Sequence, residues 1–118
     1  SPTVEEGGAP DERALELARL IAEGSRASRA AFLAKLETQK VTRDDLSSLF
    51  EGTRLLLSSA LLGQYGVSVP ERDLRIARSL ASRLTKAKLL GTIDLLQDYR
   101  NKCTYNVGGF AVELEETL

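Results

Sequence analysis

The sequence contains no histidine and a single cysteine among its 118 residues. These shortages exclude a Ser–His–Asp triad, a Cys–His pair, a histidine-ligated metal site and a disulfide framework within the chain. Proline (3) and aromatic residues (5%) are also scarce, whereas 21 residues are leucine. A leucine-rich composition with little proline favours helices over sheets. A chain of this length has enough residues to form one domain with its own core.

Long hydrophobic runs are missing as well. The longest stretch without a charged residue is 55–70, with 16 residues, and Ser, Gly and Gln interrupt it. It is too short and too polar for a transmembrane helix. The chain does not open with a charged and then apolar leader, so we expect no signal peptide. These observations predict a cytoplasmic protein with no membrane contact.

The charges nearly cancel over the whole chain but are segregated along it. Sixteen basic and seventeen acidic residues give a net charge of −1. By segment, the net charge is −4 for 1–23, +3 for 24–40, −1 for 41–69, +4 for 70–102 and −3 for 103–118. Because there is no overall basic excess, any contact with a polyanion would have to use one face only.

Residues 1–10 and 11–118 differ in composition. The first ten contain two Gly and two Pro among Ser, Thr and Glu, and we interpret them as a flexible leader. Residues 11–118 show helical spacing of apolar residues throughout, and we predict that they form a single helical domain.

We predict an all-α fold, a compact bundle of five to six helices. The expected helix starts are Asp11, Ser28, Thr42, Pro70, Thr85 and Asn106. The clearest start is at Thr42, because Asp45 follows it at capping-box spacing. Gly24 and Gly63 are placed to end the first and third helices.

Two segments, 55–62 and 89–96, are apolar nearly all round. A helix that is apolar on every side must be covered on every side. One interpretation is that both are central helices of the bundle. The other is that one face of them meets a partner chain.

Candidate chemistry is sparse. No phosphate-binding glycine motif occurs, so the sequence gives no reason to expect nucleotide hydrolysis or any cofactor. Cys103 lies near two basic residues, but a buried structural cysteine is the simpler interpretation. The acidic pairs at 44–45 and 115–116 are adjacent in sequence and do not face each other as acid–base catalysis requires.

The most basic stretch has Arg72, Arg75 and Arg78 at spacings of three, and Arg83, Lys86 and Lys88 follow. The first three form one slowly drifting helix edge, which could hold phosphates. The same edge could instead pair with the acidic first helix or with a neighbouring subunit. No aromatic residues are interleaved for base stacking, so recognition of single strands is not expected.

The last third of the chain, Ile93-Asp-Leu-Leu-Gln-Asp-Tyr through Asn106-Val107 to Ala111-Val112-Glu113-Leu114, resembles the end of bacterial clamp-loader subunits. These are subunits of the DNA polymerase III holoenzyme, and the delta-prime type is more similar than gamma/tau. The segment 17–37 looks like the family's helix, Gly-containing turn and second helix. The segment 43–62 looks like its long third helix.

The resemblance implies the C-terminal collar domain, which joins sister subunits into a ring that loads the sliding clamp on DNA. It implies a non-catalytic domain with no cofactor or small-molecule substrate, and at most an indirect DNA contact. We expect the contact edge on the last two helices. The candidate contact residues are Leu96, Tyr99, Tyr105, Phe110 and Leu114.

Three alternatives to the collar domain, and one alternative for the contact residues, stay open at this point. The helices and the leucine excess also suit a helical adaptor or regulatory domain with another protein partner. A helical DNA-binding domain would use the basic edge, and a small enzyme has the least support. For the last-helix candidates Phe110 and Leu114, a place in the core is as reasonable as a contact role.

Overall fold

The structure, a computed structural model, describes residues 12–102 and 106–118. The leader predicted at 1–10, the start predicted at Asp11 and the residues Cys103 and Tyr105 lie outside these ranges. The described residues form six α-helices and one 3-10 turn, with no strand. In chain order they are α2 (Glu12–Glu23), α3 (Arg26–Thr38), α4 (Arg43–Gln64), η1 (Glu71–Asp73), α5 (Leu74–Arg83), α6 (Lys86–Lys102) and α7 (Val107–Thr117). The predicted all-α bundle of five to six helices is therefore confirmed.

The helix starts follow local capping chemistry. The Thr42 hydroxyl accepts from the Asp45 N–H at 3.0 Å and the Asp45 carboxylate accepts from the Thr42 N–H at 3.2 Å, which is the predicted capping box. Thr85 and Asn106 also cap their helices as expected, at 3.1 and 2.9 Å. The second helix begins earlier than predicted, because Ser25 is its N-cap.

Pro70 does not begin a helix directly. It precedes the 3-10 turn η1, and α5 starts only at Leu74. At the other side of this loop, α4 runs to Gln64, one residue past the predicted stop. Gly66 then turns the chain with a φ of +84°, a left-handed conformation that suits glycine.

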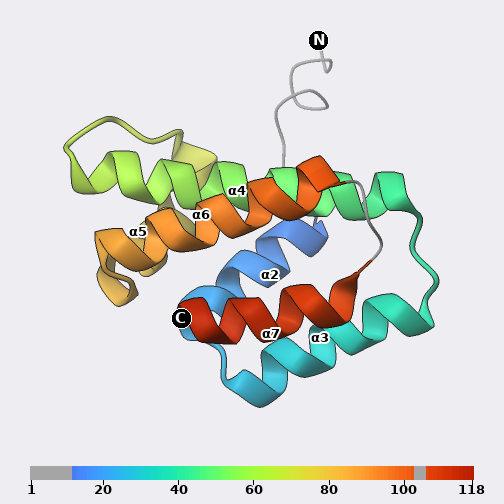
Figure 1. The fold of residues 1–118 in the computed structure, drawn as a ribbon. Coiled ribbons are helices and arrows are strands. Elements are labelled where there is room, and N and C mark those ends of the chain that lie inside the picture. The colour runs from blue at the N-terminus through green and yellow to red at the C-terminus, as the bar shows by residue number, and fades with distance from the viewer. Residues whose placement is uncertain (1–11, 103–105) are drawn as a thin grey trace, which may run out of the picture.

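The helices surround one core. α4 packs against α2, α5 and α6, while α7 packs against α3 and α6. Figure 1 shows α4 and α6 side by side, α3 and α7 side by side, and α2 between the two pairs. The apolar stripe of α4 explains its central place, since its buried residues recur at helical spacing. They are Leu46, Leu49, Phe50, Thr53, Leu56, Leu57 and Ala60.

An aromatic cluster lies where α4, α6 and α7 meet. Phe110 is fully buried, with its ring centroid 4.7 Å from that of Phe50 and 5.5 Å from that of Tyr99. The Tyr99 and Phe110 rings meet edge to face, an arrangement that aromatic pairs favour. Half of the six aromatic side chains are therefore used to fix the last two helices to α4.

Candidate interaction surfaces

The structure places four of the five candidate contact residues in the core. Leu96, Phe110 and Leu114 have no exposed surface, and Tyr99 is 5% exposed. The alternative left open for Phe110 and Leu114, a place in the core, therefore describes these two side chains. Leu96 and Tyr99 also lie in the core and not on an exposed contact edge, which corrects their prediction. The reason is that α6 and α7 turn these residues toward α4 rather than toward solvent.

Tyr99 is nevertheless a polar link between the last two helices. Its phenol donates a hydrogen bond to the Glu113 carboxylate on α7. This hydrogen bond, together with burial and the negative charges of Glu113 and Asp98, raises the pKa of Tyr99 to about 12. The phenol is therefore a stable donor at neutral pH.

On its other side, α7 is held by an ion pair with α3. The Arg29 guanidinium donates to Glu115 from Nε at 2.7 Å and from Nη2 at 2.9 Å. Its third nitrogen donates to the carbonyls of Leu20 and Gly24 at 3.1 and 2.9 Å, near the end of α2. The hydrogen bond from Arg29 lowers the pKa of Glu115, against the effect of burial.

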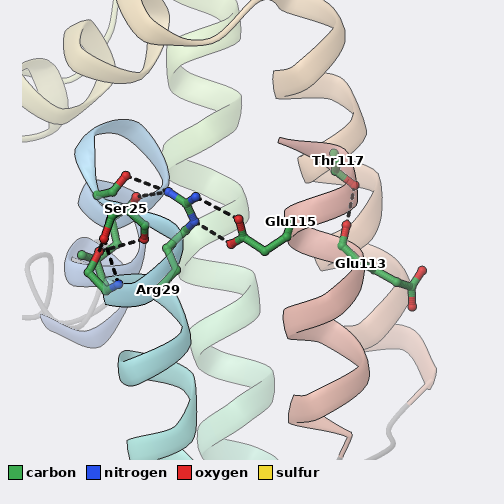
Figure 2. A network of polar contacts seen from close by, with 8 residues as sticks. Ser25, Arg29, Glu113, Glu115 and Thr117 are labelled. Carbon is green, nitrogen blue, oxygen red and sulfur yellow. Dashed lines mark hydrogen bonds and ion pairs between the residues drawn. The ribbon is translucent and has the colours of Figure 1, made fainter.

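Figure 2 shows that Glu115 points toward Arg29, whereas Glu113 points away from it. These two acids of α7 thus bind different helices: Glu115 pairs with α3, and Glu113 accepts from α6. α7 is therefore held on two sides. Val112, at 59% exposed, is the large apolar side chain that it presents.

A set of apolar side chains on α4 and α6 faces solvent instead. Leu55 and Leu62 are 52% and 48% exposed, and a spacing of seven residues places them on one side of α4, two turns apart. Leu90 of α6 is 47% exposed. We call Leu55, Leu62 and Leu90 the exposed leucines. Nothing within the described residues covers them, although neighbouring leucines of both helices are buried.

The exposed leucines belong to two helices that run antiparallel. Lys86, at the start of α6, lies over the ring of Tyr65 at the end of α4, 4.2 Å from its centroid. At the opposite ends, Arg100 and Glu51 form an ion pair at 3.0 Å. Glu51 also binds Arg54, and that hydrogen bond is the main reason that the pKa of Glu51 is lowered. Charged pairs therefore flank this surface at one end.

A groove of about 420 Å³ lies between α2 and α5, and part of the basic edge reaches it. Arg72 and Arg75 line the groove opposite the acidic residues of α2. Arg78 does not, because it lines a separate depression beside the loop after α4. The predicted edge of three arginines is thus divided between two surfaces, since the interval of three drifts around the helix.

Some of the surface features that were not predicted had a signal in the sequence, and others had none. The exposed leucines lie in the two segments recognised as apolar all round, but the pattern does not say which leucines point outward. The groove joins 12–23 with 72–79, and no local signal connects those segments. The ion pair between Arg29 and Glu115 gave no signal either, since the two residues are 86 positions apart in the sequence.

Two further features were searched for in the described part of the chain: clusters of metal ligands and helices of membrane-spanning length. No group of three or more His, Cys, Asp or Glu side chains is placed there to hold a metal ion. Nor does any helix within 12–102 or 106–118 combine the length and hydrophobicity needed to cross a bilayer.

Comparison with known proteins gives no relative: no family, no curated protein and no solved structure matches the chain. The features that bear on function are therefore the surfaces described above and the resemblance of the last third of the sequence to clamp-loader subunits.

Proposed function

We propose that this chain is a non-catalytic oligomerisation domain, the collar of a bacterial clamp-loader subunit of DNA polymerase III. The delta-prime type is the first choice and gamma/tau the second. Its work is to pack with sister subunits into the ring that loads the sliding clamp on DNA, in the cytoplasm and without a cofactor. The supporting facts are the helical bundle, the resemblance of its last two helices and an exposed apolar surface.

The observation that carries the proposal is the set of exposed leucines. A monomeric domain gains little from Leu55 and Leu62 pointing at water when the same helix buries seven other side chains. Burying a fully exposed leucine is worth about 1.5–3 kcal/mol. Because these three are already about half buried, covering the rest of each contributes about half of that to a subunit interface. The core residues Phe110 and Leu114 give the domain its shape, and the exposed leucines give it a contact surface.

A helical adaptor with some other protein partner would use the same surface, and this is the nearest alternative. The identity of the partner distinguishes the two functions. A DNA-binding domain would instead depend on Arg75 and Arg78, which are exposed and form no ion pair within the described residues.

The experiment mixes the chain with the gamma/tau and delta subunits of the same bacterium and measures the mass of the complex by light scattering after gel filtration. The native chain is expected to enter a defined complex. Leu55→Gln with Leu62→Gln should remove it, because glutamine keeps helix propensity but not apolar contact. Val112→Gln, an exposed apolar residue on α7, is the matched control and should assemble normally.

Two outcomes would overturn the proposal. One is that the native chain forms no complex with these subunits at micromolar concentration. The other is that the two leucine substitutions and the Val112 substitution behave alike. Circular dichroism and thermal unfolding of each variant show that any loss of assembly is not a loss of folding.

A further inference from the structure

The groove between α2 and α5 has an apolar floor and walls of opposite charge. Leu15 is 37% exposed and Ile76 is half-buried, so both present apolar surface to the groove. The α2 wall carries three acidic side chains and one arginine, and the opposite wall, formed by η1 and α5, carries basic ones. The charged lining residues are Glu12, Glu16, Arg19, Glu23, Arg72 and Arg75.

Most of the acidic wall is already satisfied within the chain. Glu16 forms an ion pair with Arg19 at 2.8 Å, and Glu23 accepts a hydrogen bond from the Ser79 hydroxyl at 2.5 Å. The carboxylates of α2 therefore do not pair with the arginines across the groove.

The basic wall is not satisfied in the same way. Arg72 approaches a carboxylate only at Asp73, at 3.7 Å, and its side chain is 49% exposed. Arg75 is exposed and forms no ion pair within the part of the chain that the structure describes. The groove thus offers two guanidinium groups beside apolar surface, and guanidinium groups bind carboxylates in two-pronged geometry.

This combination favours a protein over a nucleic acid. Either a phosphate backbone or a row of carboxylates could bind Arg72 and Arg75. A phosphate backbone, however, has no apolar group for Leu15 and Ile76 to contact. A helix with acidic residues along one edge and an apolar residue next to them matches both features, and a channel between two helices is a common seat for such a helix.

From these observations we infer that the groove docks an amphipathic helix of a neighbouring subunit, with its carboxylates on Arg72 and Arg75 and an apolar side chain on Leu15 and Ile76. This inference rests on the proposed oligomerisation function and adds a second contact surface to it. The groove is lined by α2, η1 and α5 only, whereas the exposed leucines lie on α4 and α6. The two surfaces can therefore be altered separately.

The test compares two double charge reversals of equal net charge. Arg72→Glu with Arg75→Glu changes the groove. Arg83→Glu with Lys88→Glu changes two exposed basic residues that do not line it. The affinity of each full-length variant for the gamma/tau and delta subunits is measured by titration calorimetry. We expect the groove substitutions to weaken the binding of one of the two subunits by a factor of about ten or more. The control substitutions should weaken binding by less than about twofold. Raising the salt concentration should weaken the complex of the native chain more than the complex of the groove variant, because the native complex includes the charged contacts.

The outcomes separate this inference from the proposed function. If the native chain binds neither subunit, the proposed function fails and this inference falls with it. If the native chain binds and the groove variant binds equally well, only the groove inference is overturned. A groove variant that keeps its subunits but loses duplex DNA would assign the groove to nucleic acid instead and also overturns the inference. Leu15→Gln, which removes apolar floor without a charge change, should weaken the same subunit as the groove variant does.

Discussion

Arg29 and Glu115, 86 positions apart in the sequence, form a two-pronged ion pair with N–O distances of 2.7 and 2.9 Å. The same guanidinium also binds two carbonyls where α2 ends. One side chain thereby joins α2, α3 and α7. Both partners are largely buried, with side chains 11% and 17% exposed, so solvent screens the pair little.

Replacing Arg29 with Ala is expected to lower the free energy of unfolding by about 2 kcal/mol, because a charge-assisted pair is lost and a part-buried carboxylate is left without its partner. In a domain of this size that corresponds to a fall of about 8 °C in melting temperature. Urea and thermal denaturation measure both values. The control is Arg19→Ala, which breaks the exposed pair with Glu16 and should cost less than about 0.5 kcal/mol. Equal losses for the two substitutions would contradict the argument.

The same pair predicts a dependence of stability on acid. Its hydrogen bond lowers the pKa of Glu115 below the ordinary value of 4.5 in the folded state. A lowered folded-state pKa gives stability that is present above the unfolded value and is lost as the pH falls through the folded value. The advantage of the native chain over Glu115→Gln should therefore shrink between neutral pH and about pH 3. Urea denaturation across this range checks it, and a constant difference would contradict it.

The fold was predictable wherever local chemistry decides it. A capping side chain accepts a hydrogen bond from a backbone N–H three residues further along the chain. Residue spacing alone therefore located the caps Thr42, with Asp45, and Asn106. The second helix was predicted to start at Ser28, but Ser25 is its N-cap. Both serines take part, with Ser25 as the cap and Ser28 three residues into the motif.

The candidate surfaces were less predictable, for a physical reason. Leu89 and Leu90 are chemically identical neighbours, yet one is fully buried and the other is 47% exposed. A segment that is apolar all round carries no periodic signal for its outward side, so only the positions of α4 and α7 decide it. For the same reason Leu96 and Leu114 could be taken for contact residues although the bundle covers them.

Two adjacent glycines in the first turn of α7 offer a matched pair of substitutions. A methyl group at Gly108 would meet no atom within 4 Å, whereas one at Gly109 would lie 2.5 Å from the amide nitrogen of Asn106 and 2.9 Å from the phenol of Tyr99. Gly108→Ala should therefore stabilise the helix, by up to about 1 kcal/mol. Gly109→Ala should destabilise the domain by about 1–2 kcal/mol, because it displaces the Asn106 cap.

Thermal denaturation of the two alanine variants measures the difference, and the sign is the test. If both substitutions stabilise the protein, the prediction is wrong. The side chains of Asn106 and Tyr99 would then move aside without a loss of folding free energy.

Alkaline titration should detect the raised pKa of Tyr99. The hydrogen bond to Glu113, followed by burial, raises its pKa to about 12. A raised folded-state pKa gives stability that is complete below the unfolded value near 10 and is lost as the pH rises through the folded value. Because the chain has no tryptophan, near-ultraviolet absorbance follows tyrosinate alone. Part of the absorbance change should be delayed toward pH 12, and Tyr99→Phe should remove that part. An unchanged titration curve in Tyr99→Phe would contradict the assignment.

Two exposed arginines of α5, Arg75 and Arg78, allow a decisive test of the DNA-binding alternative. Arg75 and Arg78 line different depressions, and the depression lined by Arg75 is also lined by carboxylates of α2. A phosphate backbone therefore cannot contact both guanidinium groups without approaching negative charge. We therefore expect no measurable affinity for duplex DNA by fluorescence anisotropy at a salt concentration of about 50 mM, where phosphate contacts are strongest. A protein that relies on several phosphate contacts would bind there and lose much of its affinity by about 200 mM. Binding with that salt response, abolished by Arg75→Glu with Arg78→Glu but not by Arg83→Glu with Lys88→Glu, would establish a DNA-binding edge and displace the protein-contact role argued for this helix.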